Sequence, residues 1–151
     1  MYTDTVTVFN RKKGKRGQGD MWYPSVLRNV NLSMDKASIL AKYGADASDN
    51  AVLNVRYRID GEKKTVGEKP WLPPRAWQQS QDSAAVLTFA DGEAFDFFWL
   101  GEWGGGVVSD ADYGDYVSFY DYMNRTHDYV FAVTKVAGPY GVIPHFEIVG
   151  K

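Results

Sequence analysis

Hydrophobic residues along the chain recur mainly at every second position, which is the period of a β-strand with one buried face. The clearest example is residues 52–59. One face of this run holds Leu53, Val55, Tyr57 and Ile59, and the other holds Val52, Asn54, Arg56 and Arg58. Similar β-rich runs cover residues 5–10, 21–32, 63–66, 129–136 and 145–149. Turn-forming residues such as Asp60-Gly61 separate the runs. The pattern therefore predicts short strands joined by turns.

We expect residues 86–103 to organise the rest of the fold. Asp91-Gly92 separates two apolar runs in this stretch. A type I′ turn favours this dipeptide, so the pattern predicts a two-stranded hairpin. In the second strand the apolar residues alternate between two faces: Phe95, Phe97 and Trp99 on one, Phe98 and Leu100 on the other. A strand that is apolar on both faces is expected to be central, with protein packed over each side.

Three segments depart from the strand pattern. Residues 35–44 suit either a short helix closed by glycine or an extended segment, and residues 45–50 suit a loop. Residues 67–84 hold three prolines and two tryptophans. Because proline disrupts helix interiors and central strands, we expect an irregular or polyproline-like arm there. Residues 104–128 form an acidic, tyrosine-rich insertion. Its helical spacing of aromatic residues predicts one short helix: Tyr116, Phe119, Tyr120 and Met123.

These elements predict a single β domain over residues 1–151. The fold class is mainly β: a small β-barrel or sandwich of seven to nine short strands, with long loops and one short loop-borne helix. The 151 residues, 44% of them hydrophobic, suit one soluble globular domain. A chain of this length buries about two thirds of its unfolded surface.

Charge is distributed unevenly along the chain. Residues 1–90 carry a net charge of +5, and residues 91–128 carry −8. A chain with one basic and one acidic region is able to meet copies of itself with opposite charges facing. Two solvated surfaces that only maintain solubility explain the same numbers, and the sequence leaves both explanations open. The overall net charge of −2 argues against a nucleic-acid binder held by bulk charge.

The chain contains no cysteine. This excludes disulfides, cysteine metal sites and a thiol nucleophile, and it fits a protein made in reducing cytosol. The N-terminal residues lack the basic and apolar regions of a signal peptide, so we expect no export by the general secretory route. No apolar run approaches the ~20 residues that span a bilayer, so we expect no membrane partner.

Residue chemistry gives little support for catalysis. His145 lies in a strand pattern, and a metal site built from His127, Asp128 and Asp121 lacks the usual ligand spacing. Three acids near tryptophans are candidates for a glycosidase pair: Glu93, Asp96 and Glu102. Glu93 and Asp96 are expected on opposite faces of one strand, which favours structural roles. No phosphate-binding or nucleophile motif occurs. We therefore expect no catalytic residue, metal or cofactor, and no enzyme.

Aromatic and basic residues on loops are the candidates for contact with other macromolecules. The aromatic candidates are Trp71, Trp77, Trp99, Trp103, Tyr113, Tyr116 and Tyr120. For Trp71 and Trp77, burial over an open barrel end is the alternative. A basic hairpin tip is a candidate for contact with nucleic-acid phosphates, and a solvated loop is its alternative. The tip residues are Arg11, Lys12, Lys13, Lys15 and Arg16.

The chain resembles an uncharacterised family of proteins from prophages of Gram-positive, clostridia-like bacteria. The motifs that carry the resemblance are YTDTVTVFN (2–10), WYP (22–24), DKA (35–37), KPWLPP (69–74), FDFFW (95–99), GEW (101–103), DYMN (121–124), DYVFAV (128–133) and IPHFE (143–147). They extend over most of the length. The resemblance implies a phage origin and no particular activity.

A more distant likeness concerns the role. An N-terminal D-x-V-T strand (residues 4–7), a Trp-containing strand and a terminal hairpin are similar to the head-closure and head–tail joining proteins of long-tailed phages. Those proteins are small β-barrels that assemble as rings. The Pro/Trp arm and the Tyr-rich insertion have no counterpart in them, so a tail or capsid-decorating role stays open.

The first hypothesis is therefore a non-enzymatic virion structural protein, an oligomeric ring subunit of the head–tail connector. Its implied partners are portal, adaptor or tail proteins and further copies of itself, with DNA contact through the basic tip. Its implied locations are the host bacterial cytoplasm during assembly and then the virion. The second hypothesis is a carbohydrate-binding module using exposed tryptophans. The third is a small hydrolase using an acid pair.

Overall fold

The computed structural model describes residues 2–34 and 51–151, so the expected helix or extended segment at 35–44 and the loop at 45–50 lie outside the described residues. The strands are β1 (Asp4–Lys12), β2 (Met21–Met34), β3 (Ala51–Arg56), β4 (Arg58–Asp60), β5 (Lys63–Val66), β6 (Lys69–Pro70), β7 (Phe97–Leu100), β8 (Val108–Ser109), β9 (Val130–Tyr140) and β10 (His145–Gly150). The helices are α2 (Pro74–Gln79), the 3-10 helix η1 (Asp110–Tyr113) and α3 (Phe119–Thr126).

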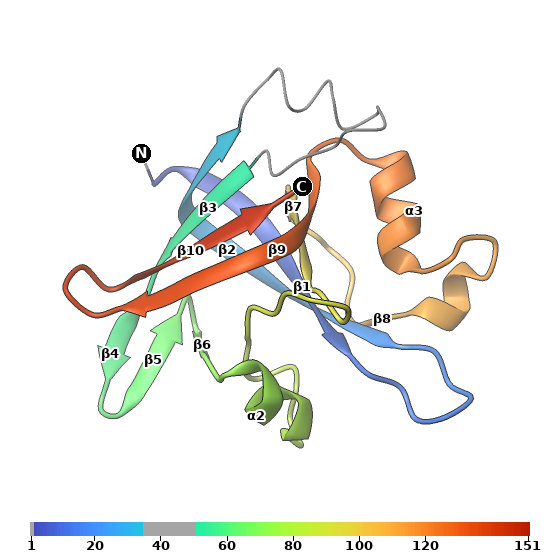
Figure 1. Cartoon of the computed structure of the whole chain (residues 1–151), viewed down its shortest axis with the longest axis horizontal. Coiled ribbons are helices and arrows are strands. Elements are labelled where there is room, and N and C mark those ends of the chain that lie inside the picture. The colour runs from blue at the N-terminus through green and yellow to red at the C-terminus, as the bar shows by residue number, and fades with distance from the viewer. Residues whose placement is uncertain (1, 35–50) are drawn as a thin grey trace.

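Six strands close into a barrel (Figure 1). They follow the order β1-β7-β9-β10-β3-β2, and β2 pairs again with β1. β8 adds to β2 outside this ring, while β4, β5 and β6 form a separate three-stranded sheet. The predicted mainly β class and small barrel are confirmed. The described residues contain ten strands, more than the expected seven to nine. Two of them, β6 and β8, have only two residues each, which is too short for a sequence pattern to indicate.

The interior of the barrel is filled by alternate residues of its strands. Val6 and Val8 of β1, Phe98 of β7 and Phe146 and Ile148 of β10 are at most 1% exposed and belong to one cluster. Leu53 and Val55 of β3 join them, as their alternation predicts.

A second hydrophobic cluster lies outside the barrel wall, under the acidic insertion. Phe9 and Phe97 point outward from β1 and β7 and stack with ring centroids 4.7 Å apart. Phe119 and Met123 of α3 cover them. Ser118 begins this helix by accepting a hydrogen bond from the backbone N–H of Asp121, so the predicted helix in the insertion is confirmed.

β7 is central, as predicted, but it does not belong to the predicted hairpin. It pairs with β1 on one edge and β9 on the other. Residues 86–90 form no strand, and Leu87 makes only an isolated bridge to Trp71. Gly92 adopts a positive φ of 85° within a wider loop. The loop closes through Asp96, which replaces the strand pairing that a two-residue turn would have made.

The Pro/Trp arm differs from the expected irregular segment because it contains helix α2. Pro74 occupies the first turn of α2. A backbone N–H in the first turn has no partner within the helix, so proline loses nothing there, and its fixed φ suits a helix. Trp77 on this helix is fully buried. The described residues therefore hold two α-helices instead of one.

The predicted basic hairpin tip begins later than expected. β1 continues through Arg11 and Lys12, which pair with Trp22 and Met21 of β2. Strand pairing thus removes these two residues from the tip.

Candidate binding pocket

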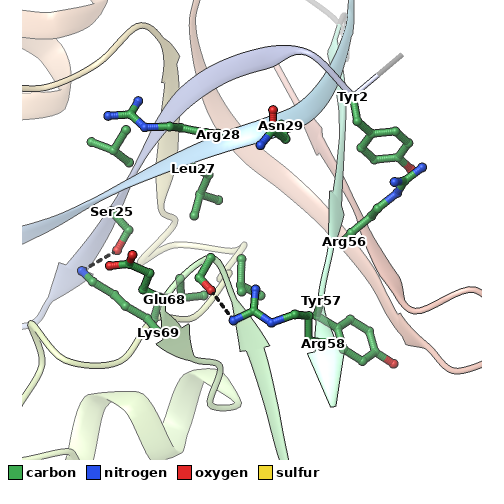
Figure 2. A pocket seen from close by; sticks show the side chains of 14 residues that line it. Tyr2, Ser25, Leu27, Arg28, Asn29, Arg56, Tyr57, Arg58, Glu68 and Lys69 are labelled. Atoms are coloured by element: carbon green, nitrogen blue, oxygen red, sulfur yellow. Dashed lines mark hydrogen bonds between the residues drawn. The ribbon is translucent and has the colours of Figure 1, made fainter. Parts of the chain in front are cut away.

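A pocket of about 810 Å³ opens between β2, the β3–β4 segment and the small sheet. Buried Leu27, Val66 and Leu87 form its apolar floor. Five charged side chains line it, the acid Glu68 and four cations: Arg28, Arg56, Arg58 and Lys69 (Figure 2). This set, with the apolar floor, is called the basic pocket below. Its volume lies within the range of pockets that enclose ligands.

The pocket exists because β2 changes neighbours along its length. β2 pairs with β1 through Val30, but it pairs with β3 only from Asn31 onward. β8 reaches β2 only at Met21 and Trp22. Between Tyr23 and Val30, the second edge of β2 therefore has no strand partner among the described residues. Such an edge presents backbone donors and acceptors to a ligand.

Lys69 lies at one end of this edge. Its ammonium donates to the carbonyl of Pro24 at 3.2 Å and to the hydroxyl of Ser25 at 2.9 Å. Both acceptors are neutral. Burial lowers the pKa of Lys69, since water that would solvate the ammonium is excluded.

The arginines reach the pocket from neighbouring strands. Arg58 donates to the carbonyl of Gly67 at 2.8 Å, and Arg56 lies 3.8 Å above the ring of Tyr2. Arg28 differs because it forms an ion pair with Glu102. In the described part of the chain, no carboxylate lies within ion-pair distance of Arg56, Arg58 or Lys69. The basic pocket thus suits a ligand that carries anionic groups beside an apolar one.

A second hollow, of about 460 Å³, surrounds Arg11. The guanidinium lies between the rings of Trp22 and Phe95, at 4.5 and 4.6 Å. Burial lowers the pKa of Arg11, while Asp20, at 3.9 Å from its Nε, and Asp110 oppose that change. Arg11 thus has acidic and aromatic partners within the chain, so this site favours a structural role.

Asp96 is a buried carboxylate that joins three segments. Its Oδ1 accepts from the backbone N–H of Arg11 at 2.9 Å. Its Oδ2 accepts from Nδ2 of Asn10 at 2.8 Å and from the N–H of Ala90 at 2.9 Å. Burial raises the pKa of Asp96 to about 7, and these hydrogen bonds act in the opposite direction. Asp96 is therefore expected to titrate near neutral pH.

The tryptophan candidates make contacts within the chain. Trp77 is fully buried, and Trp71 is half-buried with its ring 5.1 Å from that of Phe146. Trp103 lies edge-on to Phe9 at 5.6 Å, and Trp99 lies edge-on to His127 at 5.3 Å. For Trp71 and Trp77 these contacts favour the core alternative. They do not favour a coplanar, exposed platform for sugars.

The tyrosine candidates cover the second hydrophobic cluster. Tyr113 and Tyr116 pack against Tyr122, with centroid distances of 4.6 and 5.3 Å. Tyr120 lies 5.0 Å from Phe95 and fills the space above β7. All three candidates are half-buried.

The five basic candidates divide into two groups. Arg11 is held between aromatic rings, and Lys12 donates to the carbonyls of Trp77 and Ser80 at 3.2 and 3.1 Å. Lys13, Lys15 and Arg16 are exposed. Only these three cations are therefore placed to meet a phosphate backbone.

The acids proposed as a hydrolase pair do not face each other across either hollow. Asp96 is buried, whereas Glu93 and Glu102 are exposed and line neither hollow. No group of three or more metal-ligating side chains occurs in residues 2–34 and 51–151. In the same ranges, no helix is long and apolar enough to cross a membrane.

The sequence reasoning missed the basic pocket. Arg56 and Arg58 were visible as the polar face of a strand, but their convergence with Lys69 and Arg28 depends on strand pairing. One signal in the sequence could have indicated it. Arg56 and Arg58 lie two residues apart on the face opposite to Leu53, Val55 and Tyr57, so both cations are on one side of the same segment.

The fold defines the chain as a small closed β-barrel protein with a Pro/Trp arm and an acidic helical insertion packed on its wall. Its pattern over residues 1–151 matches a family of unknown function, DUF6751, and the chain belongs to that family. Neither the curated proteins nor the solved structures gave a match.

Proposed function

We propose that this chain is a non-enzymatic structural protein of a phage particle, a ring subunit of the connector between head and tail. The proposal rests on the resemblance described above together with the surface of the barrel. The single observation that carries it is the separation of the basic pocket from the acidic insertion.

The basic pocket is lined by the β3–β4 and β5–β6 segments and by the middle of β2. The β4–β5 hairpin lies at one end of the long axis, and η1 and α3 lie at the other, where the β1–β2 tip also lies (Figure 1). Residues 104–128 carry five aspartates against one arginine. A subunit whose basic and acidic surfaces are separate is suited to repeated head-to-tail contacts, which generate rings or filaments.

The exposed cations at the β1–β2 tip suit a further contact. Lys13, Lys15 and Arg16 project beyond the paired part of the two strands. Exposed cations of this kind bind phosphates, and such binding weakens as the salt concentration rises. In a connector, DNA passing through the ring is the partner that this tip would meet.

The proposal is tested by removing the chain from a bacterium that produces the particles. Electron microscopy of induced lysates is expected to show DNA-filled heads and separate tails, with joining restored by a plasmid-borne copy. Intact, infectious tailed particles in the deletion strain would contradict the proposed role.

A further inference from the structure

The side chains that line the basic pocket are those of a binding site, and no described segment of the same chain fills it. Its floor is apolar, one wall is an unpaired strand edge, and three of its four cations form no ion pair among the described residues. One acid, Glu68, also lines the pocket, so the cations outnumber the acids of the lining by four to one. A suitable occupant combines an apolar side chain with nearby acids.

Another part of the molecule presents that combination. Residues 112–117, called the acidic loop, run from the end of η1 to the start of α3. Asp112 and Asp115 are exposed, and neither makes a hydrogen bond or ion pair in the described part of the chain. Val117 is 90% exposed, although it is apolar.

The acidic loop is held in shape before any partner arrives. Tyr113 and Tyr116 both contact Tyr122 of α3, and the backbone N–H of Val117 donates to Oδ2 of Asp121 at 3.2 Å. A preformed loop loses less conformational entropy on binding than a flexible one. The loop also projects away from the barrel, at the end opposite to the β4–β5 hairpin (Figure 1).

We propose that the basic pocket receives the acidic loop of a second copy of this chain, with Val117 over the apolar floor and Asp112 and Asp115 near Arg56, Arg58 and Lys69. The inference rests on the proposed assembly role. Because the loop and the pocket are different surfaces, the contact is heterologous and leaves one free loop and one free pocket in every pair.

This geometry gives a mixing experiment with a distinctive result. A pocket variant carries Arg56→Glu and Arg58→Glu, and a loop variant carries Asp112→Lys and Asp115→Lys. Sedimentation velocity at low ionic strength is expected to show concentration-dependent association of the unaltered chain. Each variant alone is expected to associate at least about tenfold more weakly, because like charges then face each other.

An equimolar mixture of the two variants is expected to regain association, with the two variants alternating. The intact loop of the pocket variant fits the intact pocket of the loop variant, and the lysines of the altered loop face the glutamates of the altered pocket. Lys63→Glu, on the exposed β5 outside the pocket, is the matched control and is expected to associate like the unaltered chain. Thermal denaturation of all variants verifies folding, and Arg58→Gln replaces the double variant if that one unfolds.

Three results would overturn the inference: an unaltered chain that stays monomeric at its solubility limit, a mixture that stays monomeric, or a pocket variant that associates normally. Purified particles separate this contact from the proposed role. A chain found in particles without self-association would leave the role in place and remove the contact. Association of a chain that never enters particles would do the reverse.

Discussion

Replacing Asp96 with asparagine tests whether a buried carboxylate couples the fold to pH. The side chain of Asp96 is 1% exposed, and burial raises its pKa from 3.8 to about 7. A carboxyl group whose pKa is raised by folding binds its proton more tightly in the folded state. Its contribution to stability is therefore complete below about pH 4 and is lost as the pH rises through about 7.

The size of the effect follows from the shift. Each unit of pKa difference corresponds to about 1.4 kcal/mol, so a rise of about three units corresponds to about 4 kcal/mol lost between pH 4 and pH 7. Asparagine has the same shape but does not titrate. Its side-chain NH2 group also replaces one carboxylate oxygen and faces an N–H donor, so one hydrogen bond of Asp96 is lost. This loss costs about 1–3 kcal/mol of stability at every pH.

The assay is urea denaturation from pH 4.5 to pH 8.5. The free energy of unfolding of the unaltered chain is expected to compare best with that of Asp96→Asn at acidic pH. The difference then falls steadily and reverses sign near neutral pH, because the loss of about 4 kcal/mol exceeds the cost of about 1–3 kcal/mol in the variant. Asp91→Asn, at an exposed position of the same loop, is the matched control and is expected to follow the unaltered chain. Parallel curves for the unaltered chain and Asp96→Asn would refute the reasoning.

Three further predictions concern the core, the insertion and the basic tip. Trp77→Ala is expected to lower the free energy of unfolding by about 3–5 kcal/mol in urea, since the indole is fully buried; a loss below 1 kcal/mol would contradict its place in the core. Ser118→Ala removes the cap of α3 and is expected to cost about 1 kcal/mol in the same assay, whereas an unchanged value would show that the cap is dispensable. Replacing Lys13, Lys15 and Arg16 with glutamine is expected to weaken duplex DNA binding in fluorescence anisotropy and to reduce the salt slope by about 2.7, and equal slopes would exclude the tip as the contact.

The strands were predictable because their side chains alternate. Leu53, Val55 and Tyr57 lie on one buried face as their spacing indicates, but Ile59, expected on the same face, is 65% exposed because the chain leaves the barrel after Arg56. Phe97 and Phe98 lie on opposite sides of a central strand. This local pattern was sufficient for a mainly β barrel.

The predicted hairpin failed because pairing is a non-local property. Gly92 does form a turn with positive φ, but Phe97 pairs with Phe9 and Ala132, which are distant in the sequence. The Asp96 carboxylate closes the intervening loop instead. Likewise, the prolines of the arm excluded a helix interior correctly, but Pro74 occupies a first helical turn.

The basic pocket could not be derived from the sequence, since its cations come from different strands and converge only where β2 leaves β3. The charge asymmetry of the chain was visible in advance. Its meaning depended on the fold, which places the β4–β5 hairpin and the acidic loop at opposite ends of one molecule (Figure 1). Arg58 of that hairpin lines the basic pocket.

Quantitative mass spectrometry of density-purified phage particles tests the central claim most directly. The account predicts that the chain co-purifies with DNA-filled particles at one fixed ratio to their portal protein, in every preparation. A chain that is abundant in the producing cell but absent from purified particles would contradict it.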